Sequence, residues 1–124
     1  MEKIVIQKLP ELTEAARAAL APLMGDFDFA GEIVAGRCEL WSINRGQSWL
    51  ITEIDGSELE ICCITGRHVK TLIQWLHQSA KKRGLKTARM FTDRESVVKL
   101  YRRWGYHFSP VGQRGEETEY RMTL

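Results

Sequence analysis

A short segment between an apolar run and a helical pattern has residue types suited to binding an anion. It consists of Ile64, Thr65, Gly66, Arg67, His68, Val69 and Lys70. A helix start offers backbone N–H groups without partners and the positive end of the helix dipole, and glycine lets a backbone approach a phosphate closely. Thr65 or Gly66 could help cap the helix, and Arg67 and Lys70 could add positive charge. The segment is therefore a candidate anion-binding site.

Two histidines are placed where an imidazole could act as a base. His68 lies at the helix start just described, and His107 lies beyond a second helical pattern. A lone histidine is more often structural or exposed, so the alternative for both is a role without chemistry. No two histidines have the spacing of metal ligands, and we expect no metal site.

The composition indicates a folded chain with one core. It has 124 residues, of which 44% are hydrophobic and 27% are charged, and this suits one core built around a sheet. We therefore expect one domain over residues 1–124. The start of the chain lacks the pattern of a signal peptide, and no later window approaches the length of a membrane span. We therefore expect a cytoplasmic protein. Because Cys38, Cys62 and Cys63 suit neither a zinc site nor a disulfide framework, we also expect these cysteines to be reduced.

The charge is unevenly distributed along the chain. Residues 1–62 carry five Lys or Arg against eleven Asp or Glu, and residues 63–124 carry thirteen against five, which gives the halves net charges of −6 and +8. A basic half could attract a phosphorylated cofactor, a nucleic acid or an acidic protein. The alternative is that these charges cover solvated helix faces, since basic runs end both helices predicted in this half, where cations complement the helix dipole.

The periodicity of apolar residues predicts an alternation of strands and helices. Alternating residues predict strands, helical spacing predicts helices, and glycine-containing turns separate them. The acidic stretch 26–36 has weak periodicity and predicts a loop with about one turn of helix. In chain order, the predicted elements are a strand over 3–8, a helix over 11–24 whose last turn Pro22 ends or distorts, strands over 37–44, 48–54 and 58–64, a helix over 68–83, a strand over 86–92, a helix over 95–104, and strands over 106–111 and 119–124.

The residues that end the last predicted helix form a recognisable phrase. They read Leu100, Tyr101, Arg102, Arg103, Trp104, Gly105 and Tyr106. This phrase resembles the Leu-Tyr-x-x-x-Gly-Phe phrase of the GCN5-related N-acetyltransferase (GNAT) family. The preceding elements also fall in that family's order, so the resemblance covers nearly the whole chain. It implies an α/β domain with the GNAT-like acyl-CoA N-acyltransferase fold, in which helices flank a central, mixed but mostly antiparallel sheet.

The resemblance implies the transfer of an acetyl group from acetyl-CoA to an amine. Tyr101 matches the tyrosine that in many members of the family protonates the departing thiolate. The alternative is a core tyrosine, because the helical spacing places Tyr101 on the inward face with Val97, Leu100 and Trp104.

A general base in this family is commonly an acidic residue on the strands of the meander. Glu60 and Glu58 are the nearest candidates by position, and Glu53 lies behind them. The alternative for each of these carboxylates is a solvated residue on the outer face of a strand.

Members of the family hold the cofactor pyrophosphate with a loop of the form Gln/Arg-x-x-Gly-x-Gly/Ala before a helix. In this chain Ile64 takes the Gln/Arg place, and Arg67 and Val69 take the two glycine places. The motif is absent residue by residue, and only Gly66 lies nearby. By position, the resemblance nevertheless implies that residues 64–70 are the ones that contact the cofactor.

Three functions remain open on this basis. The first is an acetyl-CoA-dependent N-acetyltransferase acting on an amine of a small molecule or a protein. The second, suggested by the missing glycine motif, is a catalytically inactive GNAT-like binding or structural module, and some bacteriophage virion proteins resemble such shortened domains. Nucleic-acid binding through the basic half ranks third, and no membrane partner is expected. The resemblance also implies a homodimer formed through the terminal strands.

Overall fold

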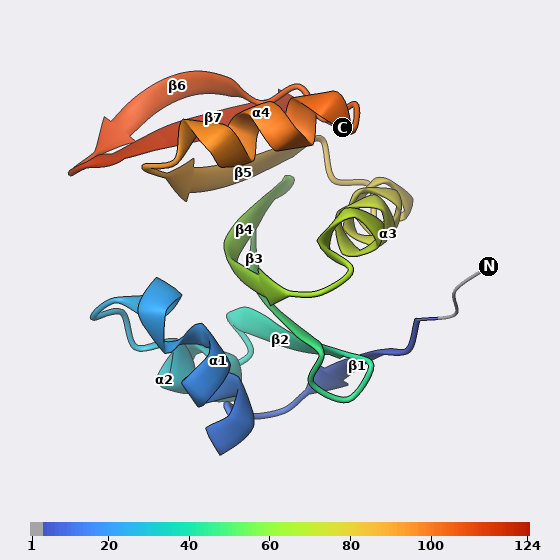
Figure 1. Ribbon diagram of the computed structural model, residues 1–124, viewed down its shortest axis with the longest axis vertical. Coiled ribbons are helices and arrows are strands. Elements are labelled where there is room, and N and C mark those ends of the chain that lie inside the picture. Colours follow the sequence, from blue (N-terminus) through green and yellow to red (C-terminus); the bar gives the residue numbers. More distant parts are fainter. Residues whose placement is uncertain (1–3) are drawn as a thin grey trace.

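The computed structural model describes residues 4–124, which form a seven-stranded sheet flanked by helices (Figure 1). The strands are β1 (Ile6–Leu9), β2 (Cys38–Ile43), β3 (Ser48–Asp55), β4 (Glu58–Gly66), β5 (Thr87–Thr92), β6 (Ser109–Arg114) and β7 (Glu117–Thr123). The helices are α1 (Glu14–Met24), α2 (Phe29–Val34), α3 (Val69–Lys82) and α4 (Glu95–Arg103). Among these described residues, no helix has the length and apolar character needed to cross a membrane.

The strands follow the order β1-β2-β3-β4-β5-β7-β6 across the sheet. All neighbouring strands are antiparallel except β4 and β5, which run parallel and are connected through α3. Parallel neighbours need such a crossover, because the chain must return to the same edge before it starts the second strand. The expected mixed, mostly antiparallel sheet with flanking helices is confirmed.

The helices cover the two faces of the sheet unequally. One core cluster joins α3 and α4 to the sheet and includes Leu72, Ile73 and Val98. The other cluster joins α1 and α2 to the opposite face and includes Leu20 and Phe29. Helices α1 and α2 contact mainly β2, β3 and β4, so the part of this second face formed by β5, β7 and β6 has no helix over it (Figure 1).

Strand β4 contains a β-bulge at Cys62. Thr52 of β3 pairs with Ile61, and the adjacent Ile51 pairs with Cys63, so Cys62 has no counterpart on β3. The extra residue interrupts the alternation of the strand: Ile61 packs in the cluster with α3 and α4, whereas Cys63, two residues later, packs in the cluster with α1 and α2. A bulge of this kind bends the strand and increases its twist.

The parallel pairing of β4 and β5 stops where this bulge begins. Their ladder runs from the pair Glu58–Thr87 to the pair Ile61–Met90, and the rest of β4 has no partner on β5. The bend at the bulge therefore directs the end of β4 away from β5, and the two strands diverge (Figure 1). This divergence opens the middle of the sheet.

The N-terminal elements differ in detail from the expectations. The first strand lies at Ile6–Leu9, later than the predicted 3–8, whose residue 3 lies outside the described residues. Helix α1 starts after Thr13, whose hydroxyl accepts a hydrogen bond from the backbone N–H of Ala16 (3.2 Å), and it continues two residues past Pro22. The stretch 26–36 contains the six-residue helix α2, which exceeds the single turn expected there.

The inward face of α4 also differs from the expectation. Val98 and Tyr101 are both only 2% exposed, whereas Leu100 is 40% exposed. Residues three apart share a helix face, so a buried face centred on Val98 and Tyr101 leaves Leu100 at its edge. The prediction that Leu100 points inward is wrong.

Candidate active site

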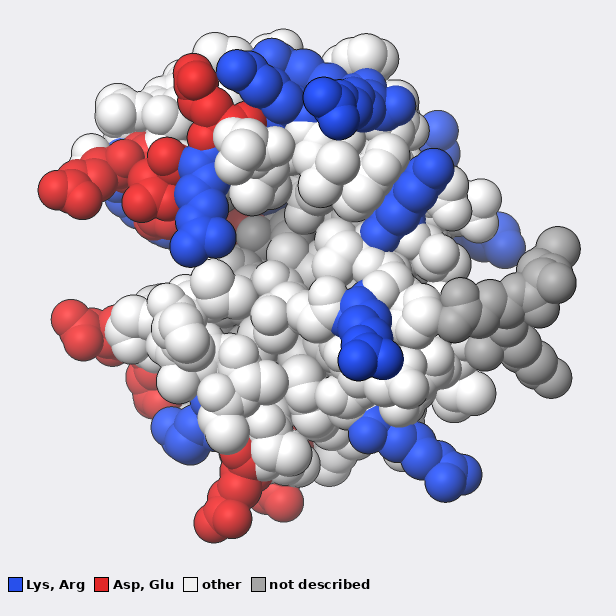
Figure 2. Space-filling model, in the orientation of Figure 1, with Lys and Arg blue, Asp and Glu red and all other residues white. Residues whose placement is uncertain are grey.

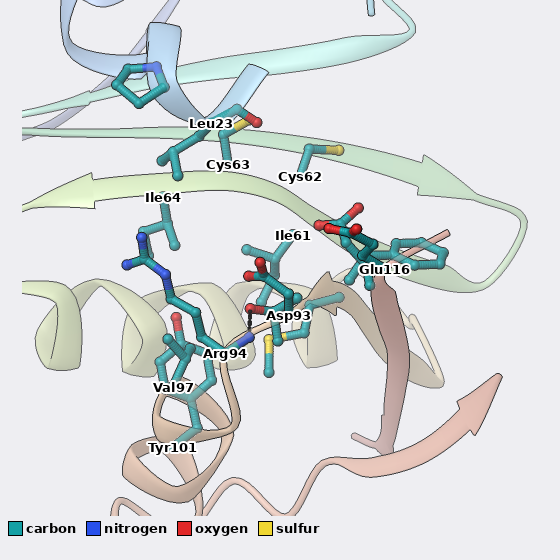
Figure 3. Close-up of a pocket in the computed structure, with 15 residues that line it drawn as sticks. Leu23, Ile61, Cys62, Cys63, Ile64, Asp93, Arg94, Val97, Tyr101 and Glu116 are labelled. Carbon is teal, nitrogen blue, oxygen red and sulfur yellow. Dashed lines mark hydrogen bonds between the residues drawn. The ribbon is translucent and has the colours of Figure 1, made fainter. Parts of the chain in front are cut away.

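A cleft with a volume of about 430 Å³ lies where β4 and β5 diverge (Figure 3). It passes from the face that carries α4 to the face that carries α1. Its walls consist of Ile61, Cys62, Cys63 and Ile64 of β4, Met90, Phe91 and Thr92 of β5, Asp93 and Arg94 of the following turn, Val97 and Tyr101 of α4, Pro22 and Leu23 of α1, and Glu116 and Glu117 near the start of β7. The cleft therefore connects the two faces of the sheet.

Tyr101 points from α4 into this cleft (Figure 3). Its ring stacks on Trp104 with the centroids 5.6 Å apart, and the residue is 2% exposed. Within residues 4–124 its hydroxyl has no hydrogen-bond partner. Burial raises the pKa of Tyr101 to about 12, because the charged phenolate is poorly solvated there. The hydroxyl is therefore protonated at neutral pH and has a hydrogen bond to donate.

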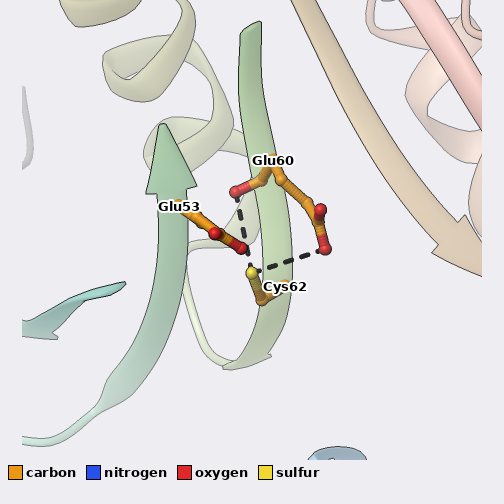
Figure 4. A group of neighbouring side chains, drawn as sticks. All are labelled: Glu53, Glu60 and Cys62. Atoms are coloured by element: carbon orange, nitrogen blue, oxygen red, sulfur yellow. Dashed lines mark hydrogen bonds between the residues drawn. The ribbon is translucent and has the colours of Figure 1, made fainter. Parts of the chain in front are cut away.

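A second cavity of about 560 Å³ adjoins the cleft on the α1 side and shares Ile61, Cys62 and Phe91 with it. Glu53 and Glu60 line this cavity and pair directly across β3 and β4. Together with Cys62 they place three donor atoms within 4.8 Å of one another (Figure 4). This group is the kind of cluster that could hold a metal ion or a charged substrate group.

The Cys62 thiol lies next to the Glu60 carboxylate and is partly buried. Burial raises the pKa of Cys62 far above its usual range, and its Sγ lies 3.6 Å from Glu60 Oε2, to which it donates. The Cys62 thiol is therefore protonated while no cation is bound to it. The group is better described as a pair of carboxylates with a thiol between them.

The two carboxylates of this pair differ in their partners. Arg89 of β5 binds Glu60, with 2.8 Å between Nη2 and Oε1. Glu53 has no ion pair among the described residues. Burial and the nearby charge of Glu60 raise the pKa of Glu53. Glu53 is therefore the carboxylate best suited to take up a proton or to bind a cation.

Glu58, the other predicted base, lies away from both cavities. Its carboxylate accepts hydrogen bonds from the Thr87 hydroxyl (2.9 Å) and from the Arg121 guanidinium (3.1 Å to Nη2), and it pairs with Arg89 (3.2 Å). The Arg121 hydrogen bond, followed by that of Thr87, lowers the pKa of Glu58. These contacts connect β4, β5 and β7. The geometry therefore indicates that Glu58 stabilises the sheet.

Replacing Glu58 with Gln should destabilise the fold in a pH-dependent way. The carboxyl has a lower pKa in the folded protein than in the unfolded chain, so its contribution is present above about pH 4.3 and is lost as the pH falls through the folded-state value. Urea titrations should show Glu58→Gln less stable than wild type by about 2 kcal/mol at pH 7, with a smaller difference at pH 3. Glu11→Gln, at an exposed site, is the control. A difference that stayed constant from pH 7 to pH 3 would contradict this account.

The predicted anion-binding segment is only partly at the cleft. Ile64 lines it, Thr65 and Gly66 end β4 in pairing with β3, Arg67 and His68 form the whole connection, and Val69 and Lys70 begin α3. His68 precedes the helix with φ 62° and caps it with no side-chain hydrogen bond. Neither Thr65 nor Gly66 supplies the cap.

Three contacts fasten the connection between β4 and α3 to the β2–β3 turn. The His68 ring nitrogen Nε2 lies 3.1 Å from Gln47 Oε1. The backbone N–H of Arg67 donates to the carbonyl oxygen of Gln47 (3.2 Å), and the Ser48 hydroxyl donates to the carbonyl oxygen of Arg67. Gly66 lies against the same turn, with φ 108°. The short connection is therefore closely packed rather than open.

Arg94 was not among the predicted site residues. It precedes α4 and extends its side chain toward Ile64 across the opening of the cleft (Figure 3). Its guanidinium has no ion pair or hydrogen bond among the described residues. A signal was present in the sequence, because a basic residue between a predicted strand and a predicted helix repeats the pattern that singled out Arg67.

This architecture is the GNAT-like acyl-CoA N-acyltransferase fold, the fold that the sequence resemblance implied. The chain is similar to an acetyltransferase from Bacillus subtilis in complex with CoA (TM-score 0.75, 16% identity, covering 98% of this chain and 99% of that chain). It is also similar to the IAA acetyltransferase from Bacillus cereus (TM-score 0.65, 17% identity, 98% and 100% covered) and to the PaiA N-acetyltransferase from Thermoplasma acidophilum in complex with coenzyme A (TM-score 0.63, 14% identity, 99% and 100% covered).

The likeness is one of three-dimensional structure. No protein-family model matches the sequence, and no curated protein matches it either. Identities of 14–17% concern the fold alone.

Proposed function

We propose that the protein is an N-acetyltransferase that transfers an acetyl group from acetyl-CoA to an amine. The observation that carries this proposal is the cleft through the sheet, which has a hydroxyl donor on one side and carboxylates on the other. Tyr101 lies in the wall of the cleft that α4 forms, and Glu53 and Glu60 lie in the adjoining cavity on the α1 side. An acyl donor and an acceptor entering from opposite faces would meet between them.

The cleft suits the acyl end of such a donor. Its middle is lined by apolar side chains, among them Ile61, Ile64, Met90 and Val97. The part of β4 beyond Ile61 has no partner on β5, so backbone groups on this edge are available for hydrogen bonds with an extended amide chain. These features fit the pantetheine arm and thioester of acetyl-CoA.

The phosphate end of the donor fits a different set of residues from the family's glycine loop. β4 and β5 are parallel neighbours, and the helices that follow them, α3 and α4, both begin at the same edge of the sheet. Helix starts at the carboxyl edge of parallel strands favour anions. Arg67 and Lys70 lie at the start of α3, and Arg94 lies at the start of α4. In this chain, charged side chains thus bind the phosphates that the family binds with the backbone of a glycine-rich loop.

The reaction needs one proton acceptor and one proton donor. The amine nitrogen attacks the thioester carbonyl carbon, the carbon–sulfur bond breaks, the nitrogen loses a proton to a carboxylate, and the departing sulfur gains one. Glu53 and Glu60 are on the side from which the amine approaches, with Glu53 the better proton acceptor of the two, and Tyr101 donates toward the sulfur. The products are the N-acetylated amine and CoA.

A second candidate function is a GNAT-like module that binds a partner without catalysis. It is favoured by the connection between β4 and α3, where the backbone N–H of Arg67 is already bonded to Gln47 and so is not free for a phosphate. A chain that kept the fold for its surface alone would have no need of a phosphate loop.

Two measurements separate these functions. Isothermal titration calorimetry with acetyl-CoA and with CoA should show binding in the micromolar range, and mass spectrometry should show acetylated products from a broad panel of amines. Absence of any binding heat at millimolar CoA, together with absence of product, would reject the acetyltransferase and leave the binding module.

Replacing Arg94 with Gln should weaken the binding of CoA about tenfold, because one charge-assisted contact to a phosphate is lost. The matched control is Arg103→Gln, which removes the same charge from the other end of α4, where the side chain is exposed and outside the cleft. Calorimetry at two salt concentrations should show a smaller salt dependence for Arg94→Gln than for the control. Equal affinities for the two variants would remove Arg94 from the cofactor site.

A further inference from the structure

The cavity on the α1 side has a mostly acidic set of charged side chains in its lining, which favours a positively charged ligand. Its volume of about 560 Å³ lies within the range of small-molecule sites. It contains three carboxylates, those of Glu53, Glu60 and Glu117, and one cationic side chain, that of Arg114. In the surface view, acidic side chains gather at the left edge, above and below a hollow, and one basic side chain lies directly above that hollow (Figure 2).

Two of the three carboxylates have an ion pair, although Arg89 also pairs with Asp55, Glu58 and Glu119. Arg114 pairs with Glu117 at 3.2 Å, and Arg89 pairs with Glu60 at 2.8 Å. Glu53 has no cationic partner within residues 4–124 and lies beside Glu60 and Cys62 (Figure 4). Glu53 is therefore the carboxylate of the lining that has no ion pair among the described residues, and an ammonium group would complement it.

Aromatic side chains form the rest of the binding surface. Phe27 and Phe29 contact each other edge to face, with 4.6 Å between centroids, and both line the cavity. Phe27 is 56% exposed, so its ring is accessible to a ligand in the cavity. Phe91 lies on the opposite side, under the guanidinium of Arg114 at 3.6 Å from the ring centroid. An apolar group attached to the ammonium would pack against Phe27 and Phe29.

We propose that this cavity binds a small primary amine that carries an apolar or aromatic group and has no carboxylate next to the nitrogen. The proposal rests on the proposed function, since it names the acceptor of that transfer. A carboxylate on the carbon beside the nitrogen would lie close to Glu53 and Glu60. Among residues 4–124, Arg114 is the only cationic side chain in the lining, and it is engaged by Glu117 and Phe91. Like charges at this range oppose binding strongly, so amino acids are excluded.

The test uses three probes that differ by one group each. Phenethylamine has both the ammonium and the ring, phenylalanine adds the carboxylate, and ethylamine lacks the ring. Binding is measured by calorimetry on the protein saturated with CoA, so that it does not depend on transfer, and acetylation is measured separately with acetyl-CoA. Phenethylamine should bind roughly 100-fold more tightly than phenylalanine and at least about tenfold more tightly than ethylamine.

The variant Glu53→Gln removes the negative charge of this carboxylate and keeps the size of the side chain. The variant should weaken phenethylamine binding about tenfold and should reduce the discrimination against phenylalanine by a similar factor. Glu11→Gln, an exposed carboxylate on the chain before α1, is the control and should leave both affinities unchanged. Retained discrimination in Glu53→Gln would overturn the role of this carboxylate.

The other outcomes separate this inference from the proposed function. Acetylation of phenylalanine as fast as phenethylamine would overturn the inference and leave the acetyltransferase standing. Binding of CoA with no binding of either amine, or acetylation only of a protein amine, would also overturn it. If CoA does not bind, the proposed function fails, and the same calorimetric comparison on the protein alone decides whether the cavity selects an amine.

Discussion

Tyr101→Phe should lower kcat for acetyl transfer about 100-fold and leave the affinity for acetyl-CoA nearly unchanged, because it removes only the hydroxyl that we propose donates toward the departing sulfur. The hydroxyl lines the cleft and has no partner among residues 4–124. A group without a partner in the resting protein is free to act in the transition state. Steady-state kinetics with the best amine of the panel, combined with calorimetric titration of CoA, measures both quantities.

Stability distinguishes this role from one in packing. Since Tyr101 is buried and its hydroxyl makes no hydrogen bond, Tyr101→Phe keeps the ring against Trp104 and should change the free energy of unfolding by less than about 0.5 kcal/mol. Tyr106→Phe is the control, because Tyr106 lies outside the cleft, against His77, and should keep full activity. Full activity in Tyr101→Phe would leave Tyr101 as a core residue only.

Gly66→Ala should destabilise the protein by about 3 kcal/mol and lower Tm by about 10 °C. A Cβ at this position would lie 2.4 Å from the carbonyl oxygen of Gln47 and 2.6 Å from Cα of Ser48, and both are backbone atoms that a rotamer change cannot move. The backbone φ of 108° adds strain for any residue with a Cβ. The β2–β3 turn must therefore separate from the end of β4. Thermal and urea denaturation measure the loss.

Gly56→Ala provides the matched comparison. Gly56 has a positive φ of 62°, but a Cβ there would meet nothing within 4 Å. It should cost about 1 kcal/mol, which is the backbone strain without the clash. The difference between the two variants measures how tightly the connection between β4 and α3 is packed.

Gly66→Ala should also weaken CoA binding, since Arg67 and Lys70 would move with the helix start. Equal losses of stability in both variants would show that the contact with Gln47 and Ser48 is loose.

Local pattern was enough to predict most of the elements and one wall of the candidate site. The strands of the meander, helices α3 and α4, and the inward position of Tyr101 follow from apolar periodicity and from glycine at turns, which act over a few residues. Helix α2 was underestimated, because its cap is a single contact, from the backbone N–H of Gly31 to Asp28, within an acidic stretch of weak periodicity. The chemistry of an acyl transfer was visible only through the family phrase around Tyr101.

Long-range pairing decided where that chemistry could occur. The alternation of side chains along β4 predicts the same face of the strand for Glu58 and Glu60. In the structure, Glu58 binds Arg121, which is 63 residues away in the chain, whereas Glu60 lines a cavity beside Glu53. The bulge at Cys62 depends on the register between β3 and β4, which no local signal specifies. That bulge bends β4 away from β5 and opens the cleft. The sequence by itself determined the order of elements and the inward position of Tyr101, and the tertiary structure decided which carboxylates line the cavity that adjoins the cleft, because strand register and ion pairing join residues far apart in the chain.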